Sequence, residues 1–254
     1  MYERRDILKT VAAVPLATLL ASPSLARAAA SSLESVSLTV PSGVRVRAAV
    51  AYPDITPAPV ILLVHEWWGL NDQIKTVAAE YARMGYMAVA VDLYGGNVTT
   101  VPAEARSYMQ QVSGDVATET LMAWMSWARA SNSSTDKLGT VGWCFGGGWS
   151  LNASIAAPAE ATVIYYGNVA RTAADLKKLE GPVLGHFASR DNWITKDMVA
   201  GFTREMKKAG QPAPIIHWYE ADHAFANPSN RVYDKADAKL AWARTADFFA
   251  KNLG

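Results

Sequence analysis

Short apolar runs and segments with helical spacing alternate along most of the chain. Residues 60–64 and 86–91 are continuous apolar runs, which are typical of strands buried on both faces. Between them, residues 73–84 place apolar side chains on one helix face, and Gly85 ends that helix. Residues 36–40 and 45–52 predict two strands that pair across the turn at residues 41–43. The first part of the chain therefore predicts a sheet with at least one crossing helix.

The same alternation continues to the C-terminus. The pattern predicts further strands over residues 138–143, 163–166, 183–187 and 215–219, and helices over residues 103–130 with a break near Gly114, 146–156, 198–208 and 232–252. Strands separated by helices predict an α/β fold with a mostly parallel central sheet and helices on both faces. We expect a single domain over residues 31–254, because no repeat or long linker interrupts it.

The first thirty residues have the layout of a bacterial export signal. Arg4 and Arg5 precede an uncharged run over residues 10–26, and small residues over 26–30 offer cleavage sites between Ala28 and Ala30. The paired arginines followed by Leu-Lys resemble a twin-arginine signal, so the export machinery is an expected partner. A membrane span needs about 20 apolar residues, more than this run supplies. We expect a periplasmic or secreted mature protein without a stable membrane anchor.

Composition excludes several classes of protein. Hydrophobic residues make up 50% of the chain and charged residues 19%, as in an ordinary globular protein. The net charge is +1 and no basic run is present, which argues against nucleic acid as a partner. Cys144 is the only cysteine, so an intramolecular disulfide is excluded. That thiol is either a small buried hydrophobic group or a reactive one.

The segment around Cys144 favours the reactive alternative. Residues 142–146 read Gly-Trp-Cys-Phe-Gly between a predicted strand and a predicted helix, like the G-x-S-x-G nucleophile turn with cysteine in place of serine. Glycines are needed there because the backbone and neighbouring elements crowd a sharp turn. The N-terminus of the following helix favours a thiolate. A glycine-rich loop around a buried cysteine is the alternative interpretation.

A cysteine nucleophile needs a base and a group that orients the base. His223 follows a predicted strand and comes after Cys144, whereas His186 and His217 fall inside apolar strands and fit structural roles better. Asp191 also follows a strand and lies between Cys144 and His223 in the order that α/β-hydrolases use. Asp222 is the rival acid, but a residue adjacent to the histidine is poorly placed to reach its ring.

Several segments together resemble the dienelactone hydrolase family of α/β-hydrolases. They are His-Glu-Trp-Trp-Gly at residues 65–69, Asp-Leu-Tyr at 92–94, Gly-Trp-Cys-Phe-Gly-Gly at 142–147, Arg-Asp at 190–191, Trp-Tyr-Glu at 218–220 and His-Ala-Phe at 223–225. The resemblance implies a triad of Cys144, Asp191 and His223 that opens esters or lactones through an acyl-enzyme. It also implies that Glu66 helps the thiol lose its proton. The implied oxyanion donors are the backbone N–H groups of Trp67 and Phe145.

The chain departs from the family pattern at two positions. The founding enzymes hold a substrate carboxylate with two arginines, where this chain has Gly96 and Asn227. Neither residue can form a charge-assisted pair with a carboxylate. Arg190 or Arg231 could supply a cation, although a solvated surface position fits each of them better. The resemblance therefore predicts hydrolysis more firmly than it predicts the substrate.

Aromatic residues are concentrated in the matched segments. We expect Trp68, Trp143, Trp193 and Phe225 to line the substrate pocket, since aromatic walls around a few polar groups are typical of small-molecule sites. An apolar or planar acyl group fits such a pocket. Neither metal-ligand spacing nor a phosphate-binding loop is present in the sequence, so we expect no metal and no cofactor.

These observations predict a cysteine-dependent hydrolase of a small ester or lactone. Two alternatives stay open at this point. One is a redox-active thiol protein that uses Cys144 alone, and the other is a catalytically silent binding protein on the same fold.

Overall fold

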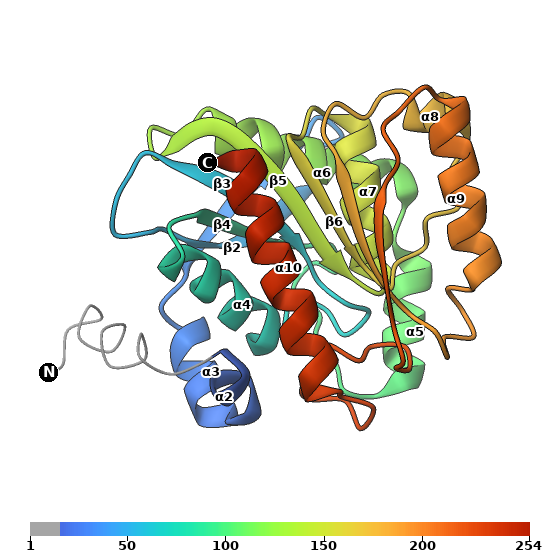
Figure 1. Ribbon diagram of the computed structural model, residues 1–254. Helices are drawn as coiled ribbons and strands as arrows, with labels where there is room; N and C mark the ends of the chain where they lie inside the picture. Colours follow the sequence, from blue (N-terminus) through green and yellow to red (C-terminus); the bar gives the residue numbers. More distant parts are fainter. Residues whose placement is uncertain (1–15) are drawn as a thin grey trace, which may run out of the picture. The chain divides into compact units, whose positions relative to one another are not determined.

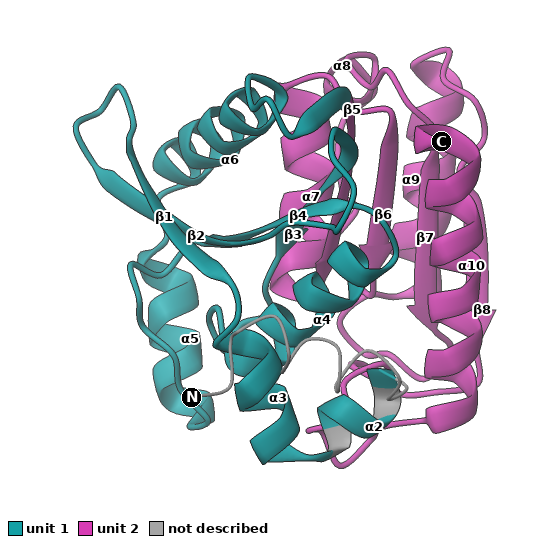
Figure 2. Ribbon diagram, turned by 90° about the vertical axis from the view of Figure 1, so that its left-hand side faces the viewer, with its two compact units in different colours: residues 1–136 teal, residues 137–254 magenta. Residues whose placement is uncertain are grey.

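The computed structural model describes residues 16–254. Arg4 and Arg5, on which the twin-arginine prediction rests, lie outside the described residues. The chain divides into two compact units, residues 1–136 and 137–254, which are coloured separately in Figure 2. The boundary falls inside strand β5 (Ser134–Trp143) rather than in a linker. The single domain expected over residues 31–254 stays a prediction.

The first unit contains a four-stranded arrangement in the order β1-β2-β4-β3. The β1–β2 and β2–β4 pairs are antiparallel, and β3 and β4 are parallel. Its strands are β1 (Glu34–Thr39), β2 (Arg45–Ala51), β3 (Ala58–Val64) and β4 (Met87–Asp92), and its helices are α2 (Leu16–Ala21), α3 (Pro23–Ala30), α4 (Asp72–Arg83), α5 (Pro102–Gln111) and α6 (Gly114–Arg129).

Part of the segment expected to be an export signal is helical in this unit. Helices α2 and α3 pack on α4, with Ala26 and Ala29 buried. The hydroxyl of Thr76 on α4 donates a hydrogen bond of 3.0 Å to the carbonyl oxygen of Ala26. Among residues 16–254 we find no helix with the length and apolar character that crossing a membrane requires.

The second unit contains four parallel strands in the order β5-β6-β7-β8. After β5 these are β6 (Ala161–Tyr165), β7 (Val183–Ala188) and β8 (Ile215–Tyr219), and the helices are α7 (Phe145–Ala156), α8 (Ala173–Leu176), α9 (Lys196–Lys208) and α10 (Lys235–Leu253). The carboxyl ends of parallel strands meet at one edge, so the residues that follow β5, β6, β7 and β8 are brought together there.

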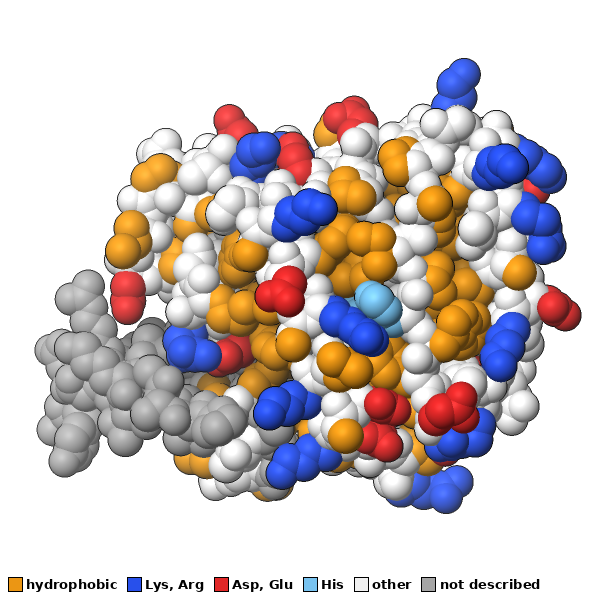
Figure 3. All heavy atoms as spheres, viewed as in Figure 1, with side chains coloured by type: hydrophobic (Ala, Val, Ile, Leu, Met, Phe, Trp, Pro, Cys, Tyr) orange, Lys and Arg blue, Asp and Glu red, His pale blue; other side chains and the backbone are white. Residues whose placement is uncertain are grey.

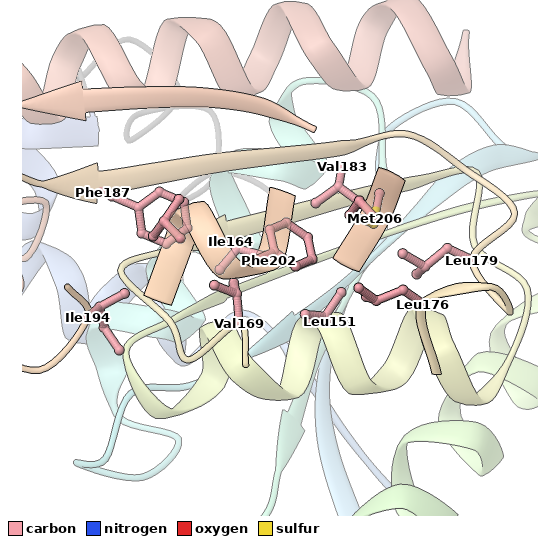
Figure 4. Close-up of a cluster of buried hydrophobic side chains, with 11 residues drawn as sticks. Leu151, Ile164, Val169, Leu176, Leu179, Val183, Phe187, Ile194, Phe202 and Met206 are labelled. Atoms are coloured by element: carbon pink, nitrogen blue, oxygen red, sulfur yellow. The ribbon is translucent and has the colours of Figure 1, made fainter. Parts of the chain in front are cut away.

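Helices cover both faces of these four strands (Figure 1). Neighbouring residues of a strand point to opposite faces. Ile164 and Phe187 belong to an apolar cluster with residues of α7 and α9, drawn in Figure 4. Tyr165 and His186, one position away in each strand, instead make contacts with α10. Burying one large apolar side chain contributes about 1.5–3 kcal/mol to the free energy of unfolding. The cluster between the strands and helices α7 and α9 therefore stabilises this unit.

The strands and helices predicted from periodicity are present, with ends that differ by a few residues. The predicted helix over residues 103–130 is interrupted before Gly114, because Ser113 caps α6 by accepting a hydrogen bond from the backbone N–H of Val116. Helix α8 was not predicted, since its four residues are too few to show a period. The mixed pairing in the first unit and the parallel strands of the second agree with the predicted α/β class.

Candidate active site

Cys144 occupies a strained turn between β5 and α7. It is the residue directly before α7, and its φ of 54° and ψ of −116° lie in a region that L-amino acids rarely adopt. Its backbone N–H donates a hydrogen bond of 3.0 Å to the carbonyl oxygen of Tyr165, at the end of β6. The thiol is partly exposed. The turn therefore presents the sulfur at the carboxyl edge of the strands, at the N-terminus of a helix.

Glycines allow this turn because the backbone segments nearly touch. A Cβ atom on Gly142 would lie 1.9 Å from the carbonyl oxygen of Gly146. A Cβ atom on Gly147 would lie 2.7 Å from the carbonyl oxygen of Tyr165, and one on Gly167 would lie 2.4 Å from the carbonyl carbon of Gly147. Side chains at these positions would force the nucleophile turn away from β6.

Asp191 lies in the loop after β7, with its carboxylate fully buried. One oxygen accepts a hydrogen bond of 2.6 Å from Nδ1 of His223. The other accepts hydrogen bonds from the backbone N–H groups of Trp193 and Ile194, at 2.8 and 3.0 Å. Burial alone would raise the pKa of Asp191, but these hydrogen bonds outweigh burial and lower its pKa. Asp191 is thus held as a carboxylate.

His223 lies between Asp191 and the thiol of Cys144. Burial of the ring acts to lower its pKa, but hydrogen bonds with Asp191 and Cys144, together with their negative charges, raise the pKa of His223 to about 10. The structure therefore brings the three residues together in the order thiol, imidazole, carboxylate. Both contacts favour the protonated form of the His223 ring.

Comparison with known proteins identifies the family. The sequence profile of the dienelactone hydrolase family matches residues 46–253, which span both units. The chain belongs to the dienelactone hydrolase family. It is therefore a hydrolase of the carboxylic ester and lactone class.

Individual relatives agree with this assignment. The chain is 27% identical over 231 residues to the carboxymethylenebutenolidase of Pseudomonas putida, a match that covers 85% of this chain and 96% of that protein. It is 24% identical over 227 residues to carboxymethylenebutenolidase 1 of Cupriavidus pinatubonensis, covering 85% of this chain and 96% of that protein.

A solved structure supports the fold class. The dienelactone hydrolase-like promiscuous phosphotriesterase P91 from metagenomic libraries superposes with a TM-score of 0.77 at 21% identity, covering 87% of this chain and 99% of that one. The α/β-hydrolase fold predicted for this family member is confirmed.

Asp222, the rival acid, has a different partner. Its carboxylate pairs with the guanidinium of Arg190 at 3.4 Å, and both side chains are about half exposed. The two residues stand next to Asp191 and His223 in sequence, and the backbone N–H of Arg190 donates to the carbonyl oxygen of Ala221 at 3.1 Å. Arg190, considered above as a cation for the substrate, therefore ties together the loops that carry the acid and the base.

Aromatic rings surround His223 within the second unit. The rings of Trp193 and Tyr166 lie 5.0 and 5.1 Å from the His223 ring, centroid to centroid. Trp193 is 70% exposed and remains the best placed of the predicted pocket residues to meet a substrate. Tyr166 was not predicted. Its position directly after the buried strand β6, at the same edge as Cys144, was the available signal.

Two other predicted pocket residues are packed beneath the site. Trp143 is only 6% exposed and stacks on Tyr165, with ring centroids 5.5 Å apart. Phe225 is fully buried against Tyr166 and Tyr219. Both rings are therefore packed against neighbouring aromatic groups. Their role in lining the substrate pocket stays a prediction.

Five further positions were singled out from the sequence: Glu66, Trp67, Trp68, Gly96 and Asn227. Glu66, Trp67 and Trp68 follow β3 in the first unit, and their part in the site stays a prediction that rests on the family resemblance. Gly96 has a φ of 96°, a conformation that suits glycine better than arginine. Asn227 is buried and its side-chain oxygen accepts the backbone N–H of Ser229 at 2.8 Å, which shapes the loop after His223.

The raised pKa of His223 predicts a measurable titration. We expect NMR of the ring protons to give a midpoint near pH 10, and Asp191→Asn to move it downward because the largest favourable contact is lost. The folded-state pKa lies above the ordinary 6.5, so the imidazolium stabilises the fold at low pH. That contribution to the free energy of unfolding is lost as pH rises from 6.5 to about 10.

Asp222→Asn is the matched control for that titration. It removes a neighbouring carboxylate of the same kind, whose partner is the exposed Arg190, and should move the midpoint of His223 far less than Asp191→Asn does. A wild-type midpoint near 6.5, or equal shifts in the two variants, would contradict the proposed contacts of His223.

Proposed function

We propose that this protein is a cysteine-dependent hydrolase that cleaves a small ester or lactone through an acyl-enzyme on Cys144. The observation that carries the proposal is that His223 is hydrogen-bonded to both Cys144 and Asp191 at the carboxyl edge of parallel strands. The sulfur sits on a strained turn at a helix N-terminus, which stabilises negative charge. A nucleophile, a base and a group that orients the base are the parts that acyl transfer requires.

The first half of the reaction forms a thioester. The thiolate of Cys144 attacks the carbonyl carbon, and the electron pair of the C=O bond moves to oxygen. When the pair returns, the bond to the alcohol oxygen breaks, and the leaving alkoxide takes a proton from the imidazolium of His223. The N–H of Phe145, with that of Trp67 by family resemblance, would hold the oxyanion. Losing one such donor costs about 3 kcal/mol in well-studied enzymes.

The second half restores the enzyme. Neutral His223, oriented by Asp191, takes a proton from water, and the oxygen attacks the thioester carbonyl. The C–S bond then breaks, which releases the acid and leaves thiolate and imidazolium again. By family resemblance, Glu66 assists the transfer of the thiol proton that gives this thiolate. Every proton moves between named groups, and this scheme uses neither a metal nor a cofactor.

Replacing the nucleophile tests the mechanism directly. We expect wild-type protein to release a burst of chromophore from an activated aryl ester, and Cys144→Ala to show neither burst nor turnover. Cys144→Ser should be much slower than wild type, because a hydroxyl needs a stronger base than a thiol.

Mass spectrometry of the quenched reaction should show one acyl group on the peptide that contains Cys144. Circular dichroism of both variants controls for folding. Unchanged turnover in folded Cys144→Ala would overturn the mechanism. Hydrogen peroxide converting the thiol to a sulfenic acid, without any ester turnover by wild type, would favour the redox alternative.

The substrate class is proposed from what replaces the two family arginines. Gly96 and Asn227 supply no charge, and Arg190 is paired with Asp222. An anionic substrate would lose hydration on entry without gaining a paired charge at these positions. The exposed Trp193 beside His223 favours contact with an apolar or planar acyl group.

Matched neutral and anionic lactones test this proposal. We expect kcat/KM for the neutral compound to equal or exceed that for the carboxylate-bearing one across an ionic-strength series. A preference for the anion that fades with added salt would show that another cation binds it. Variants of Arg231, and of Arg47, whose guanidinium lies beside Gly96, would then identify that cation.

Export is a separate proposal. Arg4-Arg5, the short apolar run and the small residues before position 31 support cleaved export by the twin-arginine route to the periplasm. We expect the double variant Arg4→Lys, Arg5→Lys to leave uncleaved precursor in the cytoplasm. Cell fractionation and immunoblotting measure where the precursor and the mature protein accumulate. Arg45→Lys, in the mature part, is the control and should be exported normally. Mature periplasmic protein from the double-lysine variant would refute the twin-arginine route.

A further inference from the structure

A chain of buried polar groups joins β6, β7, β8 and α10 on the face opposite the apolar cluster. The hydroxyl of Thr245 on α10 is fully buried and lies 2.7 Å from the hydroxyl of Tyr165 and 3.0 Å from Nε2 of His186. Nδ1 of His186 lies 2.8 Å from the hydroxyl of Tyr219. That hydroxyl accepts a hydrogen bond of 3.0 Å from the guanidinium of Arg244. Thr245 lies inside this chain, with one branch running to Tyr165 and the other through His186 to Tyr219.

Donors and acceptors in the chain are all satisfied when His186 is neutral. Burial, with the charges of His217 and Arg244, holds the pKa of His186 well below its ordinary value, so the ring is neutral. Arg244 can only donate. Every group is satisfied when the hydroxyl of Tyr219 donates to Nδ1 and the N–H at Nε2 donates to Thr245.

One branch of the chain reaches the nucleophile turn. Tyr165, whose hydroxyl bonds to Thr245, uses its own backbone carbonyl to accept the N–H of Cys144 at 3.0 Å. The Tyr165 ring stacks on Trp143, directly before Cys144, and lies 4.5 Å from the His186 ring. The side chain of Tyr165 thus fixes the strand end to which the strained turn is bonded.

The other branch reaches the loop of the base. The Tyr219 ring packs on Phe225 with centroids 4.8 Å apart, and Phe225 packs on Tyr166, whose ring contacts His223. The carbonyl oxygen of Tyr219 also accepts the backbone N–H of Ser189, two residues before Asp191, at 2.8 Å. The position of Tyr219 therefore affects both the acid loop and the base loop.

We propose that Thr245 and His186 are positioning residues for the triad, holding the Cys144 turn through Tyr165 and the His223 loop through Tyr219. Both residues are fully buried, so they act through Tyr165 and Tyr219. The inference rests on the proposed function, because it assigns these residues to the geometry of that site. Its physical basis is that buried hydrogen bonds are directional, whereas apolar packing alone would let the strand ends shift.

Two variants at position 245 separate the hydroxyl from its bulk. Thr245→Val keeps the shape and removes the hydroxyl, and Thr245→Ser keeps the hydroxyl. Thr162→Val is the matched control, because Thr162 is equally buried and its hydroxyl donates to Ser154 at 2.7 Å on the opposite, α7-facing side of β6. Each protein is measured for Tm, for kcat and KM on an aryl ester, and for the pH profile of Cys144 alkylation by iodoacetamide.

We expect Thr245→Val to lower kcat about five- to tenfold with KM unchanged, as loss of one oriented hydrogen bond implies. Its alkylation should be slower at neutral pH and reach the full rate only at higher pH, because a displaced His223 stabilises the thiolate less. Thr245→Ser should restore both properties. Thr162→Val should lower Tm comparably while leaving kcat and the alkylation profile at wild-type values.

The inference is overturned if Thr245→Val has a lower Tm but keeps the wild-type kcat and alkylation profile. That result would show that Thr245 only stabilises the fold. The inference is also overturned if Thr162→Val changes both to the same degree. Alkylation does not depend on ester turnover. Should folded Cys144→Ala still hydrolyse the ester, the proposed function fails, while the alkylation comparison between Thr245→Val and Thr162→Val still decides the positioning role.

Discussion

The close approach of backbone segments after β5 is the constraint on which the site depends. Gly142 faces Gly146, and Gly147 faces both Tyr165 and Gly167, at separations that leave no room for Cβ atoms. This crowding keeps Cys144 in a strained conformation and bonds its N–H to the end of β6. Strain of this kind costs about 1–3 kcal/mol and persists only where surrounding structure enforces it. The packed strands and helices of the second unit supply that enforcement.

Charge at the site follows from burial combined with hydrogen bonds. Asp191 stays ionised because its two oxygens receive hydrogen bonds from His223 and from two backbone N–H groups. His223 in turn sits between two groups that favour its charged form. Burial alone would oppose both charges. The family membership, which covers most of the chain, gives this arrangement a chemical context in ester and lactone hydrolysis.

The two faces of the parallel strands serve different purposes. Ile164 and Phe187 point into an apolar cluster that stabilises the unit, while Tyr165 and His186, their neighbours in sequence, enter hydrogen bonds with Thr245. Apolar packing is strong but tolerates small displacements, whereas hydrogen bonds fix direction. The directional contacts lie on the strands whose ends carry Cys144 and Tyr166, the aromatic neighbour of His223.

The sequence by itself determined the α/β class and the order of strands and helices, because these depend on local periodicity. Short motifs at strand ends, together with the family resemblance, also predicted Cys144, Asp191 and His223 as the candidate triad. The sequence favoured Asp191 over Asp222 as the acid, and the structure pairs Asp222 with Arg190. Only the tertiary structure decided that Trp143 and Phe225 pack beneath the site, that Tyr166 contacts His223, and that Thr245 links β6 with β7. Thr245 follows Tyr165 by eighty positions and His186 by fifty-nine. Contacts over such separations are set by how α10 packs across the strands, and no local pattern encodes them.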